Sequence, residues 1–86
     1  MYKIQISKTA TKFLSKVPKK DQEKIAIRIK ELSNDPRSDE VIKLTNIQPD
    51  TYRARQGDYR IKFHIHDEIL IIDVIDIDHR KDVYRR

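Results

Sequence analysis

The sequence predicts an α+β fold in which two helices cover one face of a mainly antiparallel sheet. Two observations carry this prediction. After a short strand, the first half of the chain has apolar residues at helical spacing, and the second half alternates apolar and polar residues with a period of two. The 86 residues, 37% hydrophobic and 38% charged, suffice for one small core. We therefore expect residues 1–86 to form a single domain.

The predicted order is an N-terminal strand, a two-helix hairpin, a three-stranded antiparallel meander that completes one sheet, and a short C-terminal tail or helical turn. Residues 2–6 alternate as a half-buried strand, and Ser7 or Thr9 can then cap a helix. This first helix ends at Pro18, because proline lacks the amide proton that a helix interior needs. Its apolar stripe consists of Ala10, Phe13, Leu14 and Val17.

The second helix is predicted from a buried line of Ile25, Ile29 and Leu32, which Ala26 widens. Its end is marked by Asn34 and Pro36. The charged residues expected on its solvent side are Lys19, Lys20, Lys24, Arg28 and Lys30.

Residues 35–50 read as irregular, with an apolar patch at 41–44 that can dock on the core. Residues 51–56 and 59–66 both alternate, and Gly57 with Asp58 between them is typical of a hairpin turn. A turn at 66–68 leads to the final strand, expected at 69–77.

Composition excludes several classes of function. The chain has no cysteine and one glycine, so it offers no disulfide, no thiolate and no glycine-rich phosphate loop. His64 and His66 stand two apart without a third ligand at a recognisable spacing, so we expect no metal and no cofactor. We also expect no membrane segment and a cytoplasmic location. The net charge of +5 favours nucleic acid, an acidic protein segment or an anionic surface as partner.

The strands place their cations on one face. Side chains two apart share a face, so Arg53 and Arg55 point together, as do Arg60, Lys62 and the two histidines of the next strand. Exposed Arg and Lys on a sheet also serve solubility, but arginine in particular suits bidentate contact with phosphate. Asp73, Asp76 and Asp78 are interpreted as partners of these cations or as the frayed end of the last strand, with acid–base catalysis as the alternative.

Two motifs carry a family resemblance. Residues 51–61, Thr-Tyr-Arg-Ala-Arg-Gln-Gly-Asp-Tyr-Arg-Ile, and residues 79–85, His-Arg-Lys-Asp-Val-Tyr-Arg, resemble the RelE branch of the RelE/ParE toxin superfamily, and the likeness covers the whole chain. It implies the toxin of a type II toxin–antitoxin system, a ribosome-dependent mRNA endoribonuclease that cuts in the A site by metal-free attack of the ribose 2′-oxygen and so inhibits translation. The implied catalytic residues are Arg53, Arg55, Arg60, Arg80 and Tyr84, and the implied RNA-binding residues are Lys62, His64, His79, Lys81 and Arg85.

The chain departs from the family pattern at three positions. Arg53 and Arg55 stand where well-known members have lysine, and arginine does not serve as a base. Proton transfer therefore falls to Tyr84, which ionises more readily beside cations, with His79 as acid or helper. Tyr84 can alternatively stack on a base. Asp78 replaces a glycine that is usual in relatives, which affects the turn into the tail.

Two other functions remain open at the level of sequence. One is non-catalytic inhibition of DNA gyrase, as in the ParE branch, and the other is simple nucleic-acid binding. The resemblance also implies a cognate antitoxin, whose acidic amphipathic segment would wrap this basic chain, together with the ribosome and mRNA as partners.

Overall fold

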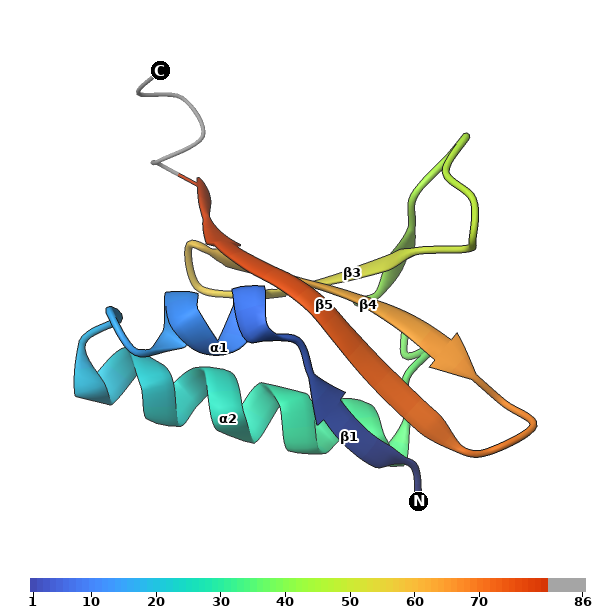
Figure 1. The fold of residues 1–86 in the computed structure, drawn as a ribbon, viewed down its shortest axis with the longest axis horizontal. Helices are drawn as coiled ribbons and strands as arrows, with labels where there is room; N and C mark the ends of the chain where they lie inside the picture. Colours follow the sequence, from blue (N-terminus) through green and yellow to red (C-terminus); the bar gives the residue numbers. More distant parts are fainter. Residues whose placement is uncertain (81–86) are drawn as a thin grey trace.

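The computed structural model describes residues 1–80 as two helices packed on one face of a mixed sheet (Figure 1). This is the α+β class predicted from the sequence. In chain order the elements are β1 (Lys3–Ile6), α1 (Lys8–Leu14), α2 (Lys19–Asn34), β2 (Ile42–Lys43), β3 (Tyr52–Gln56), β4 (Tyr59–His66) and β5 (Ile71–His79). Neither helix is long and apolar enough to span a membrane within the described residues.

The strands lie in the order β1-β5-β4-β3-β2. β1 runs parallel to β5, and the other neighbours are antiparallel. β2 adds a short strand that the sequence analysis left irregular; its two residues pair with Tyr52 and Arg53 at the edge of the sheet. The two-residue pairing is too short for alternation to predict it.

The helix hairpin begins where predicted. Ser7 is the N-cap of α1, and its Oγ accepts a hydrogen bond of 3.0 Å from the amide of Ala10. The same hydroxyl donates to the carbonyl of Ile75 in β5 at 2.8 Å, which ties the start of the helix to the middle of the sheet. Gln22 bridges the two helices, because its Nε2 donates to the carbonyls of Leu14 and Val17.

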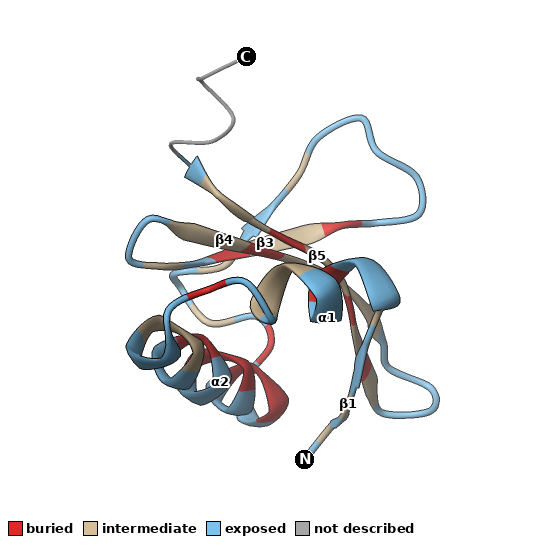
Figure 2. Ribbon diagram, turned by 60° about the vertical axis from the view of Figure 1, so that its left-hand side comes forward, coloured by how far each residue is buried: buried red, intermediate tan, exposed pale blue. Residues whose placement is uncertain are grey.

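The core lies between the helices and the sheet, where buried residues from both layers face each other (Figure 2). Ala10, Val17, Ile25, Ile29 and Leu32 come from the helical hairpin as predicted, and Ala54, Ile61, Phe63, Ile72, Val74 and Ile77 come from the sheet. Two expectations for α2 are wrong. Ala26 is exposed and does not widen the buried line, and Arg28 is buried at 8% exposure instead of facing solvent.

The final strand is also displaced by two residues from its predicted bounds. Residues 67–70 form the turn, in which Leu70 has a φ of 54° and Ile69 is 65% exposed. Ile69 and Leu70 belong to the turn, so β5 begins at Ile71 and extends to His79, which pairs with Tyr59 at the far end of β4. Asp78 therefore lies inside the strand and not in the connection to the tail.

An irregularity in the β4–β5 ladder changes the faces of β5. Phe63 pairs with Val74 but Lys62 pairs with Asp76, so Ile75 is an extra residue on β5. Before it, Asp73 points away from the helices, and after it the even-numbered Asp76 and Asp78 do the same. The bulge thus gathers all three carboxylates on the face that the helices leave open.

Candidate functional site

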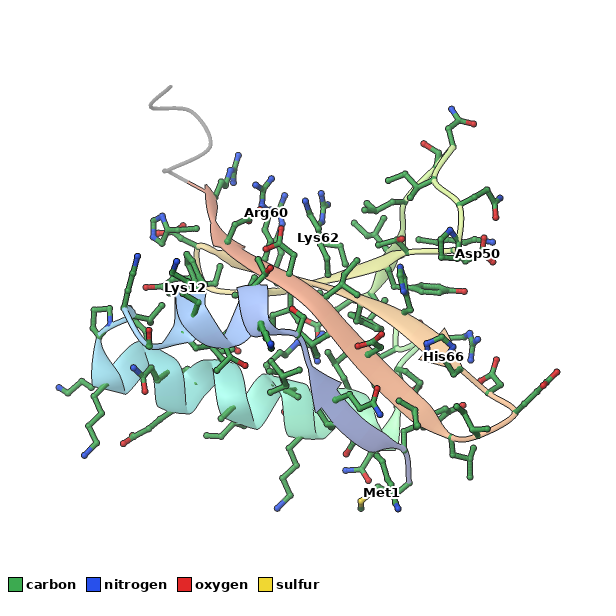
Figure 3. All side chains as sticks on the ribbon, viewed as in Figure 1. Met1, Lys12, Asp50, Arg60, Lys62 and His66 are labelled. Atoms are coloured by element: carbon green, nitrogen blue, oxygen red, sulfur yellow. The ribbon has the colours of Figure 1, made fainter. Side chains whose placement is uncertain are left out.

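Four basic side chains lie together on the open face of the sheet, and we call this group the cationic face: Arg53, Arg55, Arg60 and Lys62. The antiparallel register sets Arg53 opposite Lys62 and Arg55 opposite Arg60, as the sequence analysis predicted for aligned polar sides. Figure 3 shows Arg60 and Lys62 projecting from the sheet on the side away from both helices. Opposed pairs on adjacent strands are close enough for two cations to act on one anion.

Asp78 contacts two of the four residues of the cationic face, Arg60 and Lys62. Its Oδ1 accepts a 2.7 Å hydrogen bond from Nε of Arg60, and its Oδ2 lies 3.7 Å from Nζ of Lys62. The Arg60 side chain is 15% exposed and that of Asp78 is 24% exposed, so this contact is shielded from water. The interpretation of Asp78 as a partner of nearby cations is confirmed, and it lowers the net positive charge near Arg60.

A buried arginine supports the strand that carries Arg53 and Arg55. Nε of Arg28 in α2 donates to the carbonyl of Arg55 at 3.3 Å, and its Nη1 lies 3.3 Å from Glu31. Nε of Arg53 is itself buried and has no hydrogen-bond partner among residues 1–80. Buried donors of this kind are uncommon in folded proteins. Arg28 was missed because a charged residue on a helix normally faces solvent.

The tail begins beside the β3–β4 turn. The amide of Arg80 donates to the carbonyl of Asp58 at 2.8 Å, which places the Arg80 backbone next to the turn that joins Arg55 to Arg60. Arg80 is exposed. Tyr84, Lys81 and Arg85, which the sequence analysis assigned to catalysis and RNA binding, lie outside the described residues.

His79 points to the opposite side of the sheet. It pairs with Tyr59, and the two rings meet edge-on with centroids 4.8 Å apart. Tyr59 faces the helices, where it contacts Phe13 and donates to Asp21 at 2.8 Å. His79 therefore lines a polar cavity of about 230 Å³ on the helical side and does not join the cationic face. The expectation that His79 assists at the same phosphate is not supported by this geometry, because side chains alternate along a strand.

The two remaining histidines continue the open face toward the other end of β4. His64 lies opposite Asp73, and the latter is also 4.0 Å from Nε2 of His66. The structure thus brings to the two histidines a carboxylate that sequence spacing did not reveal, and one possible ligand atom from each of the three residues lies within 4.8 Å of the others.

A second charged cluster braces the β4–β5 turn. Arg37 makes two hydrogen bonds to the carboxylate of Asp67, at 3.0 and 2.7 Å, and the hydroxyl of Tyr2 donates to the same carboxylate at 2.7 Å. These hydrogen bonds, from Arg37 first and Tyr2 second, lower the pKa of Asp67 to about 2. The bond to Asp67 in turn raises the pKa of Tyr2.

An apolar groove lies on the other side of the molecule, between β1 and α2. Its volume is about 540 Å³, and its lining includes Ile4 and Ile6 of the edge strand and Ala26 and Ile29 of α2. Ile6 is 42% exposed. Exposed apolar surface of this extent beside an edge strand is typical of a protein-binding site.

Comparison with known proteins identifies the class. A family model described as the ParE toxin of the type II toxin–antitoxin system, parDE, matches residues 4–84. The chain belongs to this family of type II toxins. It is also 44% identical over 36 residues to Toxin RelG of Mycobacterium tuberculosis, a match that spans 42% of this chain and 41% of that relative.

Solved structures of RelE toxins share the whole fold. The archaeal RelE-RelB complex from Pyrococcus horikoshii OT3 matches with a TM-score of 0.81 and 29% identity, covering 99% of this chain and 98% of the other. The RelBE2 toxin–antitoxin complex of Mycobacterium tuberculosis matches with a TM-score of 0.81 and 28% identity, covering 92% and 98%. The intact E. coli RelBE complex matches at 0.78 and 25%, covering 92% and 96%. The predicted RelE-type toxin is thereby confirmed.

Proposed function

We propose that this toxin is a ribosome-dependent mRNA endoribonuclease. The observation that carries the proposal is the alignment of Arg53 with Lys62 and of Arg55 with Arg60 on the face left open by the helices. A single-stranded backbone presented to this face meets cations on both sides of one phosphate. The ribosome would supply what an open sheet face lacks, namely a fixed path for the message.

The chemistry proposed is transesterification. The ribose 2′-oxygen loses its proton and attacks the adjacent phosphorus, and the 5′-oxygen leaves and takes up a proton. Arg53 and Arg55 bind the phosphate, while Arg60 and Arg80 stabilise the charge that grows on its oxygens, each contributing about 3 kcal/mol at the transition state. Because arginine holds its proton, Tyr84 is proposed as the base. Lys62 and His64 extend the RNA contact along β4, and Lys81 and Arg85 are proposed to contact the message beside Tyr84.

The proposal is tested with purified 70S ribosomes carrying a defined message, with cleavage mapped by primer extension. Arg55→Ala should slow A-site cleavage by about 10²-fold, since its exposed side chain is free to contact phosphate. Tyr84→Phe combined with Arg80→Ala should abolish it. Lys20→Ala removes one exposed cation from α2 and serves as the control with unchanged cleavage. Cleavage that persists in the Tyr84 and Arg80 double variant contradicts the proposal.

Inhibition of DNA gyrase is the second candidate, because the matching family model bears the ParE name. A non-catalytic inhibitor needs affinity but no aligned base and acid. A gyrase supercoiling assay separates the two: the endoribonuclease leaves supercoiling unchanged at concentrations that stop translation, whereas the inhibitor blocks it without cutting any message.

The proposed partner is a cognate antitoxin. We propose that toxin and antitoxin act in the cytoplasm. The related structures include RelE toxins solved with RelB antitoxins. The apolar groove beside β1, on a chain of net charge +5, suits an acidic amphipathic segment that lays apolar residues against Ile4, Ile6 and Ile29.

This partnership is tested by calorimetry, in which the toxin is titrated with the small acidic protein encoded beside it. Ile6→Asp should weaken the complex by about 10-fold or more, because it puts a charge into the apolar groove and repels an acidic partner. Ile69→Asp is the matched control, since Ile69 is 65% exposed in the β4–β5 turn and does not line the groove. Equal weakening by both variants would contradict a partner in this groove.

A further inference from the structure

The open face of the sheet carries a second cluster at the end of β4 away from Arg60. His64 and His66 stand two residues apart on β4, and Asp73 lies across from His64 on β5. One ligand atom from each residue lies within 4.8 Å of the others, and Oδ2 of Asp73 is 4.0 Å from Nε2 of His66. Figure 3 shows His66 on β4, well separated along the strand from Arg60.

We propose that His64, His66 and Asp73 bind a divalent transition-metal ion, for which Zn²⁺ is the natural probe. Two imidazoles and one carboxylate form a donor set that zinc and its first-row neighbours prefer over Mg²⁺ or Ca²⁺. With three protein ligands, the fourth position is open to water on the solvent side. This site shares His64 with the proposed RNA contact along β4, but it contains none of the four residues of the cationic face, and metal binding does not depend on the proposed cleavage.

The geometry requires only side-chain adjustment. Tetrahedral zinc with bonds near 2.0–2.1 Å sets its ligand atoms about 3.3 Å apart, so atoms within 4.8 Å must approach by about 1.5 Å at most. His66 is exposed, which leaves room for its ring to reorient, while the β4–β5 ladder holds the backbones of His64 and Asp73 in register. A site on paired strands is better preorganised than one on a loop.

The electrostatic surroundings permit a cation here. Among residues 1–80, Asp73 lies within 4.0 Å of His66 and forms no ion pair with a lysine or arginine. Three cations lie along the sheet from the cluster. Lys62 stands two residues before His64, with Arg53 opposite Lys62 on β3. Lys3 lies on β1, opposite Ile71 and two residues before the partner of Asp73. Asp78 is 3.7 Å from Lys62, and Asp76 lies opposite Lys62 in the ladder. The bulge at Ile75 is what turns Asp73 and the two later carboxylates to this one face.

A bound ion would join the two longest strands of the sheet beside the turn at 67–70. An ion that binds the folded chain and not the unfolded one stabilises the folded state by mass action. It would also add positive charge to the open face, at the end that the three arginines and one lysine of the cationic face do not reach.

The test uses the untagged full chain of 86 residues with Zn²⁺ as titrant. We expect one ion per chain by calorimetry, and a rise in Tm of about 5–10 °C at a Zn²⁺ concentration about ten times the dissociation constant. Mg²⁺ at the same concentration should give no shift, because it prefers six oxygen ligands.

Variants decide whether these three residues are the ligands. His66→Gln and Asp73→Asn should each weaken Zn²⁺ binding by at least about 10-fold, since each removes a direct ligand. His66 is exposed, so its loss leaves the fold intact and isolates the effect on metal. His79→Gln and Asp76→Asn are the matched controls, because they remove the third histidine and a neighbouring carboxylate outside the cluster. Binding that is absent in the parent chain, or equal in His66→Gln, overturns the proposal, whatever the outcome for RNA cleavage.

Discussion

Replacing Asp78 by asparagine tests whether this carboxylate both stabilises the fold and restrains the cationic face. Two unit charges 4 Å apart attract by about 4 kcal/mol at an effective dielectric constant near 20, and desolvation of both groups offsets part of this. A hydrogen bond to a charged group is worth about 1.5–3 kcal/mol, and asparagine keeps one acceptor. We therefore expect Asp78→Asn to lower the free energy of unfolding by about 1.5 kcal/mol, or Tm by about 6–12 °C.

The same substitution should strengthen RNA binding. Releasing one cation for phosphate contact adds about 0.7 to the slope of log affinity against log salt for single strands, which is about fivefold in affinity at 0.1 M salt. Urea unfolding measures the first effect, and fluorescence anisotropy with a short labelled RNA at several salt concentrations measures the second.

Asp76→Asn is the control for net charge. Asp76 lies on the same strand and face, opposite Lys62, and forms no ion pair with lysine or arginine among residues 1–80. It should change stability by less than about 0.5 kcal/mol. If Asp76→Asn matches Asp78→Asn in both stability and RNA affinity, the ion pair with Arg60 is not the cause and the reasoning is refuted.

Three further predictions concern stability. Ser7→Ala should lower the free energy of unfolding, measured by urea unfolding, by about 1–2 kcal/mol, because it removes both the cap of α1 and the hydroxyl that donates to the carbonyl of Ile75. The control Ser15→Ala, at an exposed site, should change this free energy by less than about 0.5 kcal/mol. Gly57→Ala should lower the thermal midpoint by an amount equal to about 1 kcal/mol, since Gly57 has a φ of +60° and no atom crowds an added Cβ; an unchanged midpoint would contradict a purely backbone cost. Asp67→Asn should flatten the dependence of the free energy of unfolding on acid pH. The folded pKa of Asp67, about 2, lies below the unfolded value of 3.8, so the stabilisation by the ionised carboxylate is complete above pH 4 and is lost as the pH falls toward 2. A variant with the acid profile of the parent protein would exclude this stabilisation.

Periodicity predicted most of the fold because each layer here has one apolar and one polar side. The buried line of Ile25, Ile29 and Leu32 in α2, the hairpin at Gly57 and the sidedness of β3 and β4 are local patterns, and all of them are observed. The two-residue strand β2 and the burial of Arg28 were not predictable in this way. The first is defined only by its partner strand, and the second by the carbonyl of Arg55 that it meets across the layer.

The candidate site was predicted in part. The pairing of Arg53 with Lys62 and of Arg55 with Arg60 followed from alternation and one short turn. The position of His79 did not, because the end of β5 was predicted two residues early, which put His79 in the tail and not in the strand. The face of the sheet on which His79 lies could have been predicted from one signal. The adjacent apolar residues Val74 and Ile75 interrupt the alternation of the strand, which indicates a β-bulge.

The sequence by itself determined the composition of each face, since a side chain's direction along a regular element depends only on its neighbours in the chain. It thereby determined that a basic face would exist on the hairpin of β3 and β4. Only the tertiary structure decided which carboxylates meet that face, because the register of β5 against β4 and its bulge arise from pairing between strands. That pairing sets Asp78 against Arg60 and Asp73 against the two histidines, and so separates one open sheet face into the cationic face and a proposed metal site.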